Sequence, residues 1–170
     1  MIPRGAIPIL LTLFALGCED SGNRVGTADE FAIYRLADTT LNSGQVLNKP
    51  LESLNLEATP FIRVRDIRYY QWRSHSFEGT SHLDSLFGRI STSWGSVSGR
   101  PFVVVAQGER IYLGTFWWAY SSSMPQCPYI ETISPNPRRI ELPGLYQGAD
   151  PRFDPRVYSA LKSSGILLEQ

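Results

Sequence analysis

The strongest constraint on the fold is the run RPFVVVAQGERIYLGTFWWAY, which holds two apolar stretches separated by a short polar segment. The stretches at 102–106 and 110–120 are each apolar and long enough to be buried strands. Between them lie Gln107, Gly108 and Glu109, and the glycine supplies the backbone conformation that a tight hairpin turn requires. Apolar side chains occupy both alternating faces of the second stretch, which is typical of a strand covered on both sides. The sequence therefore predicts an antiparallel hairpin at the centre of the core.

Two helices are indicated by different signals. In SHLDSLFGRI, 81–90, Ser81 and Asp84 form a variant of the capping box at the helix start. Its apolar residues recur at the spacing of one helical face: Leu83, Leu86, Phe87 and Ile90. A second helix is expected over 154–165, where an aspartate can cap, a proline follows and a glycine ends the segment.

Extended segments make up most of the rest of the chain. They are expected at 31–38, 54–57, 61–64, 69–77 and 129–134, with an irregular segment at 135–153. Strands outnumber the helices and do not alternate regularly with them. The sequence therefore predicts one α+β domain over 31–170, with a mostly antiparallel sheet and two or three helices packed on one face.

The N-terminus has the organisation of an export signal. Arg4 supplies a positive charge, and the residues 6–16 form an uncharged apolar run. Eleven helical residues rise only about 16 Å, which is too short for a hydrocarbon core of about 30 Å. The run is therefore interpreted as the hydrophobic region of a signal peptide over 1–17.

The stretch Ala15-Leu16-Gly17-Cys18 resembles the lipobox of bacterial lipoproteins, with alanine where that family usually has its leucine. The resemblance implies that 1–17 are removed and that Cys18 carries a diacylglycerol, with 18–30 as a flexible tether. It also implies a cell-envelope protein held on a membrane by its lipid. Because Glu19 rather than aspartate follows the cysteine, the periplasmic face of the outer membrane is favoured over the inner membrane. The alternatives are an ordinary secretory signal and a buried N-terminal helix.

Between Phe31 and Ser134 the order of elements resembles the periplasmic head domain of the SecD translocase subunit. The shared points are Pro60, Asp66-Ile67, the helix at 81–90, Pro128 and Ile130. The resemblance implies a rigid α+β module used for contact rather than chemistry, and it assigns no functional residue.

Charge and cysteine content exclude some classes of partner. The chain has 16 basic and 16 acidic residues, so it has no strong field to attract nucleic acid, and no nucleic-acid partner is expected. If lipid occupies Cys18, Cys127 has no disulfide partner. Cys127 is then either buried and inert or a free thiol.

Two stretches are candidate binding surfaces. The first contains Trp117, Trp118, Tyr120, Cys127 and Tyr129. Because adjacent tryptophans on a strand point to opposite faces, the exposed one, with Tyr120 or Tyr129, would form a surface for sugar rings or a partner protein. The alternative is that both faces are buried.

The second stretch, FIRVRDIRYYQWR, interleaves aromatic residues with four arginines: Arg63, Arg65, Arg68 and Arg73. It would suit an anionic component of the envelope. The alternative is a solvated face of an edge strand, where charge blocks unwanted pairing.

Catalytic and metal-binding patterns are weak. His75 and His82 lie near Glu78 and Asp84, but the seven-residue spacing of the histidines fits no standard zinc motif. The chain has no Gly-x-Ser-x-Gly motif and no phosphate-binding Gly-rich loop. We therefore expect a non-catalytic binding or assembly module of the cell envelope, without cofactor or metal, whose partner is an envelope protein or a glycan. The alternative is an envelope enzyme, of hydrolase or thiol type, that uses His75 or Cys127.

Overall fold

The computed structural model describes residues 30–93 and 98–169. The helices are α1 (Ser43–Val46), α2 (Ser81–Ser93) and α3 (Pro155–Ser163), and short 3-10 turns lie at η1 (Leu51–Ser53), η2 (Val64–Asp66) and η3 (Pro151–Phe153). The strands are β1 (Phe31–Arg35), β2 (Ile62–Arg63), β3 (Ile67–Gln71), β4 (Ser76–Gly79), β5 (Arg100–Ala106), β6 (Glu109–Trp117), β7 (Tyr129–Glu131), β8 (Arg138–Arg139) and β9 (Leu167–Leu168). The predicted α+β class is confirmed.

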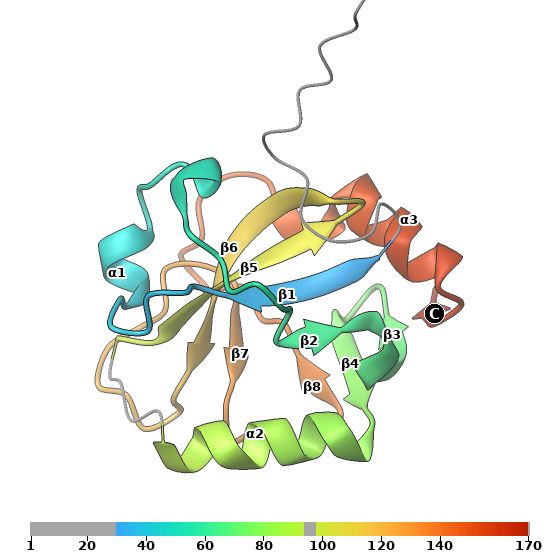
Figure 1. The fold of residues 1–170 in the computed structure, drawn as a ribbon, viewed down its shortest axis with the longest axis horizontal. Coiled ribbons are helices and arrows are strands. Elements are labelled where there is room, and N and C mark those ends of the chain that lie inside the picture. Colours follow the sequence, from blue (N-terminus) through green and yellow to red (C-terminus); the bar gives the residue numbers. More distant parts are fainter. Residues whose placement is uncertain (1–29, 94–97, 170) are drawn as a thin grey trace, which may run out of the picture.

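The strands form two sheets (Figure 1). The larger has five strands in the order β2-β1-β5-β6-β7, and the smaller has four in the order β8-β4-β3-β9. Most neighbours are antiparallel, but β6 and β7 pair in parallel, as do β3 and β9. Both sheets are therefore mixed, because β7 and β9 each run parallel to the strand beside them.

The central hairpin of the larger sheet is the predicted one. β5 and β6 pair antiparallel along their length and are joined by Gln107 and Gly108. These two residues have φ values of 54° and 76°. Positive φ at both positions is the signature of a type I′ turn, whose twist matches that of the strands it joins.

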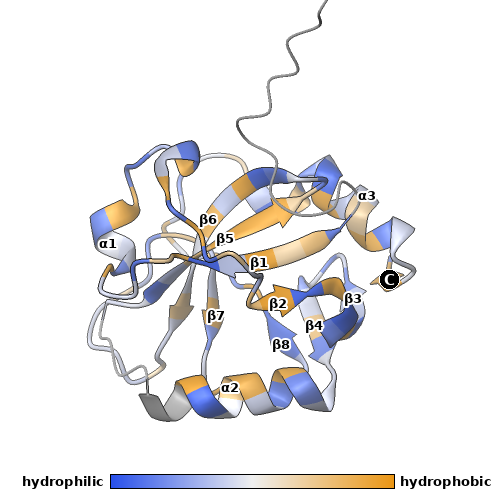
Figure 2. Ribbon diagram, viewed as in Figure 1, coloured by the Kyte–Doolittle hydropathy of each residue, from blue (hydrophilic) through white to orange (hydrophobic). Residues whose placement is uncertain are grey.

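Alternation along β1 and β5 separates two cores. One face of each strand enters the main core, which also holds apolar residues of α2 and α3. The other face packs with Val46 of α1 in a smaller cluster. Figure 2 shows hydrophobic residues along β1 and β5 and in stripes on α2. The larger sheet is thus covered on both sides, with α2 and α3 sharing the main core.

The segment expected to be extended over 69–77 is instead a hairpin of β3 and β4. The chain reverses before β4, and His75 there has a φ of 52°. This left-handed conformation is uncommon for a residue other than glycine. The turn contains neither glycine nor proline, so no local signal in the sequence marked it. The strand expected at 54–57 is also absent, since Leu56 makes only an isolated bridge with Leu36.

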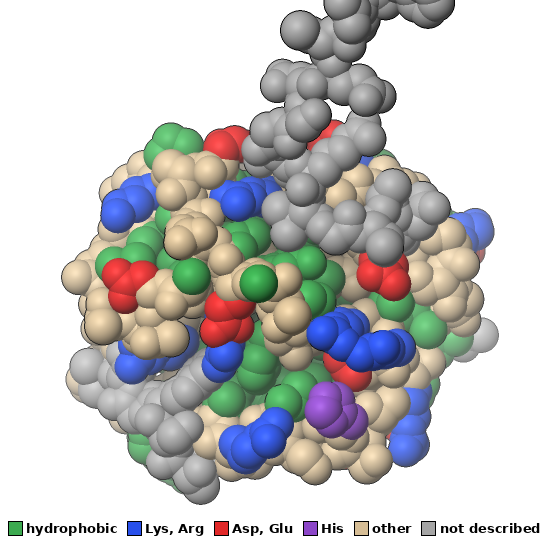
Figure 3. Space-filling view, viewed as in Figure 1, with side chains coloured by type: hydrophobic (Ala, Val, Ile, Leu, Met, Phe, Trp, Pro, Cys, Tyr) green, Lys and Arg blue, Asp and Glu red, His purple; other side chains and the backbone are tan. Residues whose placement is uncertain are grey.

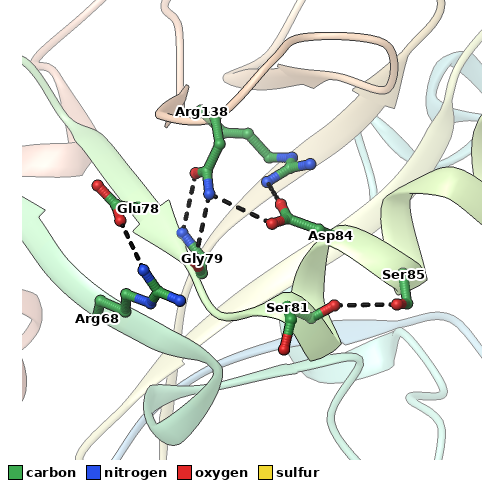
Figure 4. A network of polar contacts seen from close by, with 8 residues as sticks. Arg68, Glu78, Gly79, Ser81, Asp84, Ser85 and Arg138 are labelled. Carbon is green, nitrogen blue, oxygen red and sulfur yellow. Dashed lines mark hydrogen bonds and ion pairs between the residues drawn. The ribbon is translucent and has the colours of Figure 1, made fainter.

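The ends of the two longer helices follow different rules. In α3 the Asp154 side chain accepts a hydrogen bond from the Arg156 amide at 2.8 Å, Pro155 is the first helical residue and Gly165 has a φ of 71°, as the sequence predicted. In α2, Ser81 is already helical, and the Asp84 carboxylate accepts no backbone hydrogen bond from a described residue at the helix start. Asp84 Oδ1 instead accepts from Arg138 Nη1 at 2.7 Å (Figure 4).

Arg138 joins the C-terminal segment to the rest of the molecule. It is buried on β8, and its guanidinium lies over the Phe87 ring of α2, 4.2 Å from the centroid. The neighbouring Asn136 side chain exchanges hydrogen bonds with the Gly79 backbone at 3.0 and 3.2 Å. These contacts hold β8 against β4. β8 lies within the segment 135–153, which the sequence predicted to be irregular.

The predicted signal peptide, the lipidated Cys18 and the tether up to residue 29 lie outside the described residues and stay predictions. In the part of the chain that the structure describes, no helix is long and apolar enough to cross a membrane.

Candidate functional site

The aromatic stretch after β6 divides between the interior and the surface. Trp117 is buried at the end of β6, whereas Trp118 is half-buried. Tyr120 is 79% exposed, and its ring centroid lies 6.4 Å from that of Trp118. The adjacent tryptophans therefore differ in environment, and the outer one contacts an exposed tyrosine.

A cleft of about 180 Å³, here called the Cys127 cleft, lies beside this stretch. It is lined by Asn42, Ser43, Gly44, Leu47, Ser98, Trp117, Ser123, Met124, Gln126 and Cys127. None of these side chains is charged, and Met124 is 79% exposed. The cleft therefore offers amide and hydroxyl groups beside an indole and a thioether. It is smaller than typical pockets of about 300–1,000 Å³ for small molecules, so it suits one ring-sized group of a larger ligand.

The Cys127 thiol is not activated as a nucleophile. It is buried, and burial raises its pKa to about 12, so it stays protonated at neutral pH. His75 has its hydrogen bond with the Tyr70 hydroxyl, and His82 is exposed at the start of α2. Among the described residues, neither histidine is paired with this thiol or with a carboxylate.

Tyr129 belongs to a different part of the surface. Its hydroxyl donates a hydrogen bond to Glu141 Oε2 at 3.0 Å. Burial and the adjacent carboxylate raise the pKa of Tyr129 to about 12. Glu141 in turn lines a second cleft, so the predicted aromatic set is split between two sites.

This second cleft, here called the arginine cleft, has a volume of about 340 Å³. It is lined by Arg73, Ser74, His75, Arg139, Glu141, Leu142 and Arg152. These residues come from the β3–β4 turn, from β8 and the segment after it, and from η3. The sequence indicates Arg73 and His75 separately but not Arg139 and Arg152, because no local pattern brings these segments together.

His75 is enclosed beneath this cleft. It is 1% exposed, and its Nδ1 lies 3.1 Å from the Tyr70 hydroxyl oxygen. Its Nε2 is buried without a hydrogen-bond partner among the described residues. Burial, reinforced by the charge of Arg152, lowers the pKa of His75 to about 4. The imidazole is therefore neutral at physiological pH.

The four interleaved arginines do not form one surface. Arg63 lies on β2 and lines a hollow with His82, Arg65 is exposed in η2, and Arg68 pairs with Glu78 at 3.1 Å. Figure 3 shows basic side chains and a histidine beside a hydrophobic patch on the face that carries β2 and α2. Only Arg73 of the four lines the arginine cleft.

The acidic residues near the histidines have other partners. Glu78 pairs with Arg68, and Asp84 pairs with Arg138. Within 30–93 and 98–169, no group of three or more histidine, cysteine, aspartate or glutamate side chains is placed to hold a metal ion.

No protein-family model, curated protein or solved structure matches this chain. The function of this protein is therefore inferred from the geometry of the two clefts and from the sequence.

Proposed function

We propose that this protein is a lipid-anchored, non-catalytic module of the bacterial cell envelope that binds a glycan segment through the Cys127 cleft and the adjoining residues 118–126. The observation that carries the proposal is the uncharged lining of the cleft beside the exposed Tyr120 and Met124. Sugar rings present hydroxyl groups at their edges and apolar C–H faces. Amide and hydroxyl side chains beside aromatic surface match both features.

The anchoring part of the proposal depends on the first 18 residues. The apolar run and the lipobox-like Cys18 support export and acylation. Each buried methylene of an acyl chain contributes about 0.8 kcal/mol, so two or three chains hold a soluble domain at a membrane. Intact mass of the protein from a membrane fraction tests this directly. A chain that begins at Cys18 and carries acyl groups, both lost in Cys18→Ala, is expected; an unmodified chain in the soluble fraction would contradict it.

The enzyme alternative has less support. A thiol enzyme needs a thiolate near neutral pH, and the pKa of Cys127 is about 12. A histidine base needs a partner to orient it, and the hydrogen bond of His75 goes to Tyr70.

Binding to soluble peptidoglycan fragments tests the glycan proposal. Tyr120→Ala and Met124→Ala are each expected to weaken binding about fivefold, since each removes apolar contact of about 1 kcal/mol. Leu145→Ala is the matched control, because Leu145 is 90% exposed and does not line the Cys127 cleft. Equal affinities in all three variants, or no binding of any fragment, would contradict a glycan ligand at this surface. If no fragment bound, but an envelope protein bound the parent protein and bound Tyr120→Ala more weakly, the surface would be a protein interface instead.

A further inference from the structure

Three arginines from separate segments line the arginine cleft. Arg73 lies in the β3–β4 turn, Arg139 on β8 and Arg152 in η3. Arg73 and Arg139 are exposed, and neither forms an ion pair with any described residue. Two carboxylates lie nearby, Glu141 in the cleft and Asp150 against Arg152, so the cluster keeps one excess positive charge (three minus two).

Arg152 is held rigidly in the cleft. Its Nε and Nη2 donate to the Asp150 carboxylate at 2.9 and 2.6 Å, and its Nη1 donates to the Ile140 carbonyl at 2.7 Å. A guanidinium has five N–H groups, and these bonds engage three of them. The other two N–H groups of this fixed cation make no hydrogen bond with a described residue, and the side chain is 13% exposed.

His75 adds a neutral imidazole beneath the arginines. Its Nδ1 shares a hydrogen bond of 3.1 Å with the Tyr70 hydroxyl. The other ring nitrogen, Nε2, is buried and has no hydrogen-bond partner among the described residues. The residue also has a φ of 52°, and strained backbone of this kind concentrates at functional positions.

A partly exposed aromatic side chain, Phe153, packs against His75. Phe153 directly follows Arg152 and is 48% exposed. Its ring centroid lies 4.4 Å from that of His75 and 5.5 Å from that of Trp72, both edge to face. Phe153 does not itself line the cleft, but its ring is fixed against His75, which does, while about half of the Phe153 surface stays in contact with solvent.

We propose that the arginine cleft binds a phosphate monoester whose organic part packs against Phe153. Guanidinium groups bind oxyanions through paired, charge-assisted hydrogen bonds. Arg73, Arg139 and Arg152 together have more N–H groups than the two oxygens of one carboxylate can accept hydrogen bonds from. A phosphate monoester presents three terminal oxygens and therefore accepts more of these hydrogen bonds. The site is separate from the Cys127 cleft, so either proposal can fail without the other.

The test is an NMR-monitored titration of the protein with phenyl phosphate and with inorganic phosphate at constant ionic strength. Saturable shifts are expected at Arg73, His75 and Arg139 with both probes. Phenyl phosphate is expected to bind several-fold more tightly, because its ring can contact Phe153. Shifts that do not saturate, or that are spread over all surface arginines, would overturn the proposal.

Variants separate the site from general charge attraction. Arg139→Gln is expected to raise the Kd for both probes about tenfold, as the loss of a charge-assisted hydrogen bond predicts. Arg68→Gln removes the same charge from a neighbouring exposed position outside the cleft and should leave both Kd values unchanged. Phe153→Ala should abolish the preference for phenyl phosphate while leaving inorganic phosphate binding intact. Equal Kd values for Arg139→Gln and Arg68→Gln would overturn the assignment.

Competition distinguishes the two sources of a phosphate monoester. Displacement of phenyl phosphate by vesicles containing phosphatidic acid, but not by vesicles of phosphatidylcholine alone, would identify a lipid headgroup. Displacement by glycerol 3-phosphate but not by vesicles would identify a soluble ester. Failure of both to displace the probe would overturn the proposal.

Discussion

The five-stranded sheet is built around two long apolar strands joined by a two-residue turn, whereas the four-stranded sheet is assembled from strands of two to five residues taken from positions 67 to 168. Within its strands, the larger sheet buries one polar side chain, Thr115. The smaller sheet buries Ser76 and Arg138, with His75 directly beside it. The arginine cleft is formed at this smaller sheet.

The difference shows two ways of holding a sheet together. In the larger sheet, side chains from both faces are removed from water, so burial stabilises it without specific partners. In the smaller sheet, charged and polar groups need defined partners, because an unpaired buried group is costly. Defined polar contacts also fix side chains in the positions that a binding site requires. The following changes probe this contrast, from the largest expected effect to the smallest.

The larger sheet should be most sensitive to added volume. A Cβ on Gly114 would lie 2.3 Å from ring carbons of Phe102 and 2.9 Å from the Pro128 carbonyl oxygen. Gly114→Ala is therefore expected to lower the free energy of unfolding by about 3 kcal/mol or more. Gly88→Ala is the control, since nothing lies within 4 Å of its added Cβ on α2, and it should stabilise by about 0.5–1 kcal/mol. Urea unfolding followed by tryptophan fluorescence measures both, and a cost below about 1 kcal/mol for Gly114→Ala would show that β6 and β7 are loosely packed.

The smaller sheet should carry a pH dependence between pH 4 and 7 through His75, which lies directly beside it. The pKa of His75 is about 4 in the folded protein and about 6.5 in the unfolded chain, so the unfolded state binds more protons between these values. Stability is then fully present above pH 6.5 and falls as the pH drops towards 4. The loss attributable to this residue by pH 4 is about 3 kcal/mol, since one pKa unit corresponds to about 1.4 kcal/mol.

Urea unfolding at pH 7 and at pH 4.5 measures this effect, and a comparison of two histidine variants cancels the titration of the carboxylates that both variants share. His75→Asn, which tolerates a left-handed backbone, should flatten the difference, whereas His82→Asn at an exposed position should preserve it. The same pH profile in both variants would argue against a buried neutral His75.

Two ion pairs drawn in Figure 4 test whether burial decides how much an ion pair contributes to the free energy of unfolding. Asp84→Asn leaves the Arg138 side chain, 6% exposed, without its carboxylate. The expected cost is about 1–2 kcal/mol, reduced from that of a fully buried pair because Asp84 is 45% exposed. Glu78→Gln breaks the pair with Arg68, which is 58% exposed, and should cost less than about 0.5 kcal/mol. Equal costs in thermal or urea unfolding would contradict this ranking.

The smallest effect on stability is expected at the arginine cleft itself. Arg139 is exposed and has no ion pair with a described residue, so Arg139→Gln should leave the free energy of unfolding within about 0.5 kcal/mol of the parent protein. Urea unfolding checks this. A loss above about 1 kcal/mol would assign Arg139 a structural role in joining β8 to β4.

Local signals predicted those elements whose contacts are near in sequence. The hairpin of β5 and β6 follows from two continuous apolar runs and a turn with glycine, α2 from its apolar spacing, and α3 from Asp154, Pro155 and Gly165. The β3–β4 turn was missed because the residue in the left-handed conformation is His75. β8 and β9 were missed because two-residue strands have no pattern of their own and form only where a partner strand is present.

The sequence by itself determined the α+β class, the central hairpin and the two longer helices, because hydrophobic period and capping chemistry act within about a dozen neighbouring residues. Only the tertiary structure decided that Asp84 pairs with Arg138 instead of capping its helix. It also decided that Trp117 is buried while Tyr120 is exposed, and that Arg73, Arg139 and Arg152 share one cleft. These outcomes depend on which distant segments meet, and that is set by the packing of the whole chain rather than by any short stretch of it.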